Sequence, residues 1–295
     1  MADSKAIANR IKSVQDTRKI TNAMYLISST KLRKARRSLE ETRPFFRALR
    51  SEITRIVEHT GIRDSKYFVH EDNDSRSPGT CGILVLTADK GLAGAYNQNV
   101  IKETLRLLEE YPDYRLFVVG EYGRHYFSSH HIPFDEPFDF TDIEPTLSLA
   151  RMIAGYIMER YDRGELTQLH VIYTHFKNAM SSEVQNWRML PFETSHFSRD
   201  NMTEPYETIE YEYFPSPAEV LQKCIPVYCI GLIYSALVYS FCCEQNDRMM
   251  AMDSANQNAD KLIKELSLKY NHLRQNGITQ EITEISASVK ASHRS

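Results

Sequence analysis

The sequence lacks the cysteine and histidine spacings that mark metal sites and disulfide frameworks. Its five cysteines form an odd set with no C-x-x-C pair and no partner at zinc-finger spacing, so we expect reduced thiols. His130 and His131 lie near Asp135 and Glu136, but adjacent histidines point to opposite sides of a strand and no H-x-x-x-H spacing occurs. We therefore predict a solvated loop here and no metal.

Nucleotide-binding motifs are also absent. The segment 87–97 (TADKGLAGAYN) follows an apolar run and precedes a helical pattern, an arrangement that can hold phosphate at a helix N-terminus. It contains neither G-x-G-x-x-G nor G-x-x-x-x-G-K-[ST], and no acidic residue ends a second strand to hold a ribose. No serine, cysteine or lysine stands in a nucleophile elbow. We predict no catalytic residue, no cofactor, and a structural loop whose tip (Asp89, Lys90, Gly91 and Gly94) touches another protein.

The N-terminus has no apolar stretch of signal-peptide length and fits a transit peptide poorly, so a cytoplasmic chain is expected. One internal tract, from Cys224 to Cys243, has 20 residues without a charge, which is the length of a membrane span. Pro226, Gly231 and several serines and tyrosines lower its hydrophobicity. We prefer a helix buried against the middle domain, with a membrane span as the alternative.

The charge of the chain is distributed unevenly, although the overall composition is that of an ordinary soluble protein. Residues 1–60 have 14 Lys and Arg against 6 Asp and Glu, residues 61–215 have 14 against 25, and residues 216–295 have 8 against 8. The basic N-terminal segment is expected to meet an acidic partner, and the middle is an acidic domain with a separate role.

The N-terminal segment has the most regular periodicity. Positions spaced alternately by four and three form a heptad seam with apolar ends and a polar middle. They are Ile7, Ile11, Val14, Arg18, Thr21, Tyr25, Ser28, Leu32, Ala35 and Leu39. This pattern predicts a helix that packs on a partner helix, and Pro44 is expected to kink or end it.

A C-terminal segment has a second seam with the same heptad spacing. Ser216-Pro217-Ala218-Glu219 predicts a helix start, with Ser216 as N-cap and Glu219 closing a capping box. Seam positions are Met252, Ala255, Ala259, Leu262, Leu266, Tyr270, Leu273 and Gly277, continued by Ile278, Ile282, Ile285 and Val289 after a one-residue shift. A helix from 217 to 289 would be roughly 110 Å long, so most of it should protrude from any small domain.

Between these helices, short apolar runs alternate with helical patterns. Strands are predicted at 82–87, 116–120 and 169–176, and helices at 98–110 and 146–162, which implies a mainly parallel α/β sheet. Further strands are predicted at 184–190 and 208–213, and 71–79 is read as a polar linker. The predicted domains are therefore a helix over 1–60, an α/β domain over 61–215 and a second helix over 216–295.

Long motifs at both ends carry a family resemblance. Residues 11–24 (IKSVQDTRKITNAM) and 29–35 (STKLRKA) resemble the N-terminal signature of F-type ATP synthase gamma subunits. Residues 248–255, 262–266, 270–271 and 274–282 (RQNGITQEI) resemble the C-terminal helix of that family. The loop 89–94 (DKGLAG) is similar to its D-R-G-L-C-G motif, so the resemblance covers the whole chain.

The resemblance implies a non-catalytic rotor. Its two ends would form a long antiparallel coiled coil inside a hexamer of alternating alpha and beta subunits. A Rossmann-like α/β domain would lie near the membrane c-ring with epsilon, at the cytoplasmic face of a cell membrane. Catalysis would stay in the beta subunits, and rotation would couple ion translocation to ATP synthesis or hydrolysis.

The same resemblance implies roles for individual residues. Polar contacts to the catch loops of beta would come from Arg274, Gln275, Thr279 and Glu281, with Arg248 further along the shaft. The acidic helix-turn-helix of beta would face Met24 and the basic run Lys31, Arg33, Lys34, Arg36 and Arg37. For these charges the alternative is a solvated helix face.

Three departures from the family pattern weaken particular contacts. Ala93 and Lys90 replace the usual Cys and Arg of the loop, and Phe214 stands where an acidic residue is common. Other classes also remain open from the residues alone. A basic coiled-coil scaffold or a nucleic-acid binder without catalytic activity would use the N-terminal charge, although no DNA- or RNA-reading motif accompanies it.

Overall fold

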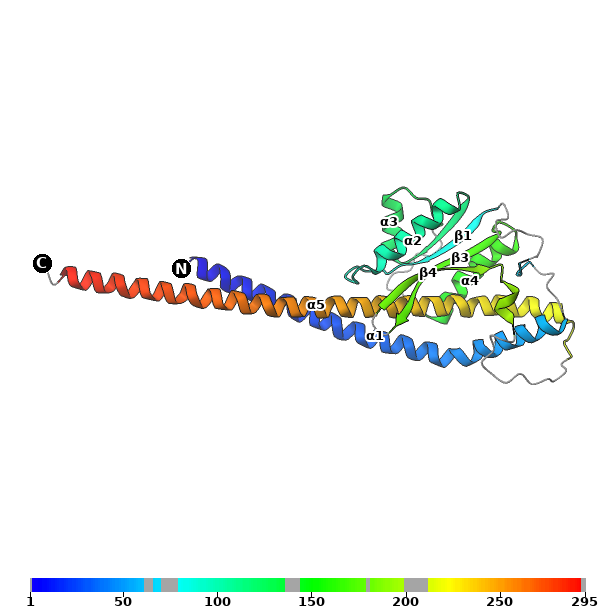
Figure 1. Cartoon of the computed structure of the whole chain (residues 1–295), viewed down its shortest axis with the longest axis horizontal. Coiled ribbons are helices and arrows are strands. Elements are labelled where there is room, and N and C mark those ends of the chain that lie inside the picture. The colour runs from blue at the N-terminus through cyan, green and yellow to red at the C-terminus, as the bar shows by residue number, and fades with distance from the viewer. Residues whose placement is uncertain are drawn as a thin grey trace. The chain divides into compact units, whose positions relative to one another are not determined.

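The computed structural model describes residues 2–60, 66–69, 79–135, 144–178, 181–198 and 212–292. It divides into two compact units, which we call the helical unit (1–29 with 248–295) and the α/β unit (30–247). Two long helices, α1 (Ala2–Thr60) and α5 (Pro217–Ser292), contribute residues to both units (Figure 1). Pro44 does not end α1, which continues to Thr60.

A four-stranded sheet forms the centre of the α/β unit. Its strands are β1 (Cys81–Leu86), β2 (Tyr114–Val119), β3 (Gln168–Asn178) and β4 (Ser181–Leu190), in the order β2-β1-β3-β4. β1 pairs in parallel with β2 and β3, whereas β4 is antiparallel to β3. The mainly parallel α/β prediction is confirmed. The predicted strand at 208–213 and the linker at 71–79 lie largely outside the described residues.

Helices cover both faces of this sheet. On one face, α2 (Tyr96–Glu110) and α3 (Glu121–Ser129) pack against Ile83 and Val85. On the other, α4 (Leu147–Asp162) and the parts of α1 and α5 in this unit pack against Leu84 and Leu86. Alternate residues of β1 thus enter opposite cores, as expected for a strand that is buried on both faces.

The uncharged tract of α5 packs into the second of these cores. Ile225, Cys229 and Ile233 are each fully buried there. A Cβ added to Gly231 would lie 2.1 Å from the Phe46 ring, so a glycine permits α1 to approach α5 closely. One helix of the described residues, containing this tract, is long and apolar enough to cross a membrane, but 56% of its apolar window is buried in the protein.

At the start of α5, the Ser216 N-cap part of the predicted capping box is present. The Ser216 hydroxyl accepts a hydrogen bond from the Glu219 backbone N–H at 3.3 Å. This bond satisfies one of the backbone donors that the first turn of a helix leaves unpaired.

In the helical unit, α1 and α5 run antiparallel. Arg18 Nε lies 3.0 Å from Asp260 Oδ1, and the Thr21 hydroxyl donates to Asn256 Oδ1. In an antiparallel pair, residues that face each other have residue numbers with a nearly constant sum. The sum is 278 for Arg18 with Asp260 and 277 for Thr21 with Asn256, and this defines the register. Side chains at most of the predicted seam positions, from Ile7 to Ser28 on α1 and from Met252 to Gly277 on α5, are buried or half-buried.

The predicted continuation of the seam beyond residue 277 is wrong. Ile278, Ile282 and Ile285 are 47%, 58% and 63% exposed. The register explains the difference, because it places Ala2, where α1 begins, opposite residues 275 and 276, so that the later turns of α5 lie beyond the described part of α1. The side chain of Val289 lies outside the described residues.

Candidate functional site

The predicted contact residues of α1 divide between the outer face of the helix and the flank of its buried stripe. Arg33 and Lys34 are exposed, and Met24 and Lys31 are half-buried. Leu32 and its neighbours on the same stripe are buried, as the heptad pattern predicts. The first turns of α1 within the α/β unit therefore present a basic surface to solvent.

One of these cations has a partner within the unit. Lys34 Nζ lies 2.6 Å from Glu144 Oε2. Its hydrogen bond holds the pKa of the Glu144 carboxyl below the usual value. Both side chains are largely exposed, so this pair contributes little stability and can exchange for another partner.

The predicted contact residues of α5 differ in their surroundings. Arg274, Gln275, Thr279 and Glu281 are all exposed. The Thr279 hydroxyl donates to the Gln275 backbone carbonyl at 2.9 Å, so it is engaged within the helix. Arg248 is only 8% exposed, which sequence spacing did not anticipate.

The loop after β1 is hydrogen-bonded to α2 and to the start of α3. The Asn97 side chain accepts the Ala88 N–H at 2.9 Å, and Asp89 Oδ1 accepts the Glu121 N–H at 3.2 Å. Asp89 therefore places its carboxylate at the N-terminus of α3, where negative charge is stabilised. Gly120 has φ +100° and approaches this loop so closely that an added Cβ would lie 2.2 Å from the Thr87 carbonyl oxygen.

The tip of this loop projects outward. Lys90, Gly91 and Leu92 are exposed, and a Cβ on Gly91 would meet nothing within 4 Å. Leu92 is 64% exposed and has φ +62°, a conformation that an L-residue adopts at a cost. Sequence analysis missed Leu92. A large apolar residue directly after Lys90-Gly91, in a loop of small and polar residues, was the available signal.

The crevice where open α/β sheets usually bind ligands lies at the carboxyl ends of β1 and β3. In this chain α5 crosses it. Ser240 Oγ accepts the Thr174 N–H at 3.1 Å, and Glu244, Thr87 and Tyr96 line a cavity of about 30 Å³. A nucleotide needs a pocket of several hundred cubic ångströms. The chain's own helix therefore fills the place where a dinucleotide would bind.

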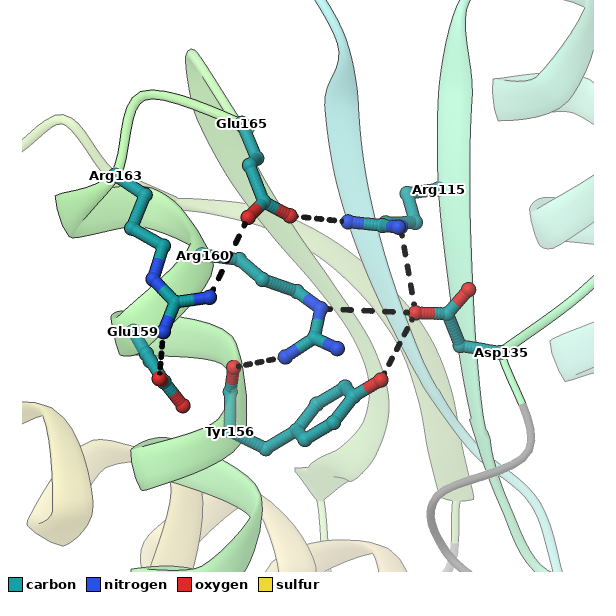
Figure 2. A network of polar contacts seen from close by, with 7 residues as sticks. All are labelled: Arg115, Asp135, Tyr156, Glu159, Arg160, Arg163 and Glu165. Carbon is teal, nitrogen blue, oxygen red and sulfur yellow. Dashed lines mark hydrogen bonds and ion pairs between the residues drawn. The ribbon is translucent and has the colours of Figure 1, made fainter.

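A polar network joins α4 to β2 (Figure 2). Arg115 Nη1 lies 2.7 Å from Glu165 Oε2, and Arg115 Nε lies 3.3 Å from Asp135 Oδ2. Tyr156 donates to the same Asp135 oxygen at 3.2 Å, and Arg160 stacks its guanidinium 3.4 Å above the Tyr156 ring.

This network is balanced in charge. Its three arginines, including Arg163, face the three carboxylates of Asp135, Glu159 and Glu165. The hydrogen bond to Glu165 raises the pKa of the Arg115 guanidinium. Because each charge has an opposite neighbour, we assign the network a structural role.

Comparisons with known proteins agree with the motifs and the fold. Residues 3–291 match the family model described as ATP synthase. The ATP synthase gamma chain of Caldanaerobacter subterraneus subsp. tengcongensis is 41% identical over 286 residues, covering 95% of this chain and 96% of the relative. This chain belongs to the ATP synthase gamma-chain family.

Solved structures of the family have the same fold. A chain in the Euglena gracilis mitochondrial ATP synthase, from a structure of OSCP, F1 and the c-ring, aligns with a TM-score of 0.66 at 15% identity, over 99% of this chain and 95% of that one. A chain in the Tetrahymena thermophila central stalk and c-ring structure aligns with a TM-score of 0.57 at 26% identity, over 80% and 99%. The predicted combination of a long helical pair with a Rossmann-like domain is therefore confirmed.

Proposed function

We propose that this chain is the rotating central shaft of an F-type ATP synthase, at the cytoplasmic face of a cell membrane. The observation that carries the proposal is the helical unit, in which α1 and α5 pair in a fixed antiparallel register and expose polar side chains around the pair. As a member of the gamma-chain family it is a non-catalytic subunit. Its partners in the complex are alpha, beta, epsilon and the membrane c-ring.

The mechanism follows from asymmetry. A single shaft makes different contacts with each of three chemically identical beta subunits, and only different contacts can shift their conformational equilibria differently. Turning the shaft moves these contacts from one beta subunit to the next. Arg274, Gln275, Thr279 and Glu281 supply polar contacts near the end of α5, and their exposure supports this assignment.

Basic residues of α1 supply a second contact region. Met24, Lys31, Arg33 and Lys34 would face acidic surfaces of beta. Exposure of Arg33 and Lys34 supports this role, and the exposed Lys34–Glu144 pair can open at little cost. Arg248 has little free surface, so we expect it to contribute less than the residues of the α5 end.

The loop tip serves a different partner. Asp89 and Gly94 shape the loop, and Lys90 and Gly91 present it to solvent. We assign the tip to a contact with another subunit of the complex, with Leu92 as its apolar anchor.

Assembly with the other subunits tests this function. The chain, carrying an affinity tag, is co-expressed with alpha, beta and epsilon from one bacterial ATP synthase, and ATPase activity is measured on the purified complex. We expect co-purification, with Arg33→Glu weakening assembly or activity and the exposed control Arg151→Glu on α4 leaving both unchanged. A chain that recruits neither alpha nor beta would overturn the proposal.

A further inference from the structure

The antiparallel strands β3 and β4, which we call the β3–β4 pair, are joined to α5 by two side-chain hydrogen bonds. Ser240 Oγ accepts the Thr174 N–H of β3 at 3.1 Å, and the Ser182 hydroxyl of β4 donates to Asp247 Oδ2 at 3.3 Å. Ser240 and Asp247 are about two helical turns apart, so they lie on the same side of α5. This side of α5 therefore runs along the β3–β4 pair in the last turns of the α/β unit.

Arg36 of α1 lies against the same strands. Its guanidinium carbon is 5.0 Å from the centroid of the Phe176 ring on β3, within the range of a cation–π contact. Phe176 pairs with Ser182 of β4 and packs against the hydrophobic cores on both faces of the sheet. The cation on this ring thus ties α1 to the β3–β4 pair, close to the point where the pair is bonded to α5.

The same guanidinium also reaches α5. Burial raises the pKa of the Cys242 thiol to about 11, and the charge and hydrogen bonding of Arg36 oppose this rise. Arg36 therefore lies beside the Cys242 thiol as well as over the Phe176 ring. Three elements, α1, β3 and α5, meet at this one side chain.

The next basic residue of α1 has different surroundings. Arg37 Nε lies 2.9 Å from Glu41 Oε1, one turn along the same helix, and both side chains are largely exposed. The family resemblance implies that Arg36 faces beta together with the rest of the basic run. Its position over Phe176 favours a contact within the chain instead.

We propose that Arg36 is a positioning residue that clasps α1 to the β3–β4 pair, so that the helices of the shaft do not turn independently of the α/β unit. This role rests on the proposed function, because a rotor must pass torque between its helices and this domain. Without the clasp, ATP hydrolysis would still turn the helices, but part of that turning would be lost before it reached the membrane ring.

Hydrogen–deuterium exchange on the full isolated chain tests the contact itself. Arg36→Gln removes the cation, and because Arg36 is exposed this change leaves the core intact. Phe176→Leu removes the ring. We expect Arg36→Gln to speed exchange of the amides around the Phe176–Ser182 pair about two- to five-fold, the range set by an exposed cation–π contact, and Phe176→Leu to speed it at least as much.

Three further variants sharpen this measurement. Arg36→Lys keeps a cation and should restore most of the protection. Combining Arg36→Gln with Phe176→Leu should add nothing to Phe176→Leu alone, because no contact is left for the second change to remove. Arg37→Gln is the matched control and should leave these amides unchanged. Unchanged exchange in Arg36→Gln, or effects that add in the double variant, overturns the clasp.

The role in torque transmission is tested on the assembled complex in membrane vesicles. ATPase activity is measured together with the membrane potential that it generates, read by an oxonol dye whichever ion is pumped. We expect Arg36→Gln and Phe176→Leu to lower the potential formed per ATP hydrolysed by about two-fold or more. Arg36→Lys and the exposed control Arg151→Gln on α4 should retain it.

The outcomes separate the clasp from its alternatives. A ratio that falls in Arg36→Gln but not in Phe176→Leu would show that Arg36 contacts another subunit, and an unchanged ratio in both would overturn the role in torque transmission. A wild-type chain that does not assemble overturns the proposed function and this role with it, whereas the exchange measurements judge the clasp by themselves.

Discussion

Arg18 Nε of α1 lies 3.0 Å from Asp260 Oδ1 of α5, across the helical pair. About half of each side chain is exposed, so the ion pair itself is worth at most about 1 kcal/mol. Its importance is geometric. Together with the neighbouring Thr21–Asn256 hydrogen bond it shows which turns of the two helices face each other.

This register predicts where a disulfide can form. Thr21→Cys with Asn256→Cys should crosslink under mild oxidation, because their side chains already touch. Ile20→Cys with Asn256→Cys is the control. Ile20 is 62% exposed and lies on a different face of α1 from the seam residues. Mobility on non-reducing gels measures the extent of crosslinking in each double-cysteine variant. Equal crosslinking of the two pairs, or none in the first, would contradict the register.

The exposed end of α5 should matter for coupling more than for folding. Arg274→Ala with Gln275→Ala changes exposed residues, so the free energy of unfolding should shift by no more than about 0.5 kcal/mol. A lost charge-assisted contact is worth about 1.5 to 3 kcal/mol, enough to change conformer populations of beta roughly ten-fold. We expect an assembled complex with impaired multisite ATPase activity and ATP synthesis.

The control for this variant is His125→Ala with Ser128→Ala, two exposed residues of α3. Normal turnover in an assembled Arg274→Ala, Gln275→Ala complex would remove these residues from the mechanism. A fall in the melting temperature of the isolated chain would instead place them in the folded core.

Close packing of α1 on α5 predicts a steric effect at Gly231. Gly231→Leu should destabilise the chain by about 2 kcal/mol, because an added Cβ already meets the Phe46 ring. Gly155→Ala on α4 is the matched control. A Cβ there meets nothing within 4 Å, so this helix should gain about 0.5 to 1 kcal/mol. Urea unfolding measures both, and a neutral Gly231→Leu would refute the close contact.

His196 predicts a dependence of stability on pH. Burial, together with the nearby charge of Arg50, lowers the pKa of this imidazole from 6.5 to about 4. The ring packs on Phe192 and lies 3.0 Å from the Tyr228 hydroxyl, which suits the neutral form. The unfolded chain binds the proton first as pH falls, so stability is full above about pH 6.5 and declines toward pH 4.

The expected loss is about 2 kcal/mol, since part of the ring remains near solvent. His196→Gln should be less stable at neutral pH but lack this contribution to the slope between pH 6.5 and 4. Urea unfolding at several pH values measures it. An identical slope in wild type and variant would show that His196 does not titrate in this range.

Periodicity identified the helices and strands because each of these elements is amphipathic or buried along several residues. The stripe at Leu32 and Ala35 and the strand at 81–86 are examples. Periodicity could not predict the register in which α1 and α5 pair. Ile282 has the spacing of a seam residue, but the pairs Arg18–Asp260 and Thr21–Asn256 show that it lies beyond the described part of α1.

Contacts between segments distant in sequence were likewise not predictable. Nothing in the spacing of Ser240 or Glu244 indicates that α5 crosses the carboxyl ends of β1 and β3. The burial of Arg248 and the projection of Leu92 also depend on tertiary packing and backbone geometry. Motif absence predicted that the sheet would not bind a nucleotide, and this stays a prediction.

Rotation tests the central claim most directly. An assembled complex is fixed to a surface through its alpha and beta subunits, and a bead is attached to an introduced cysteine at the exposed Ser129 of α3, because the natural cysteines are buried or half-buried. On addition of MgATP, we predict continuous rotation of the bead in one direction, which stops when beta is inhibited. A bead that stays still while the same complexes hydrolyse ATP would contradict the assignment of this chain as the rotor.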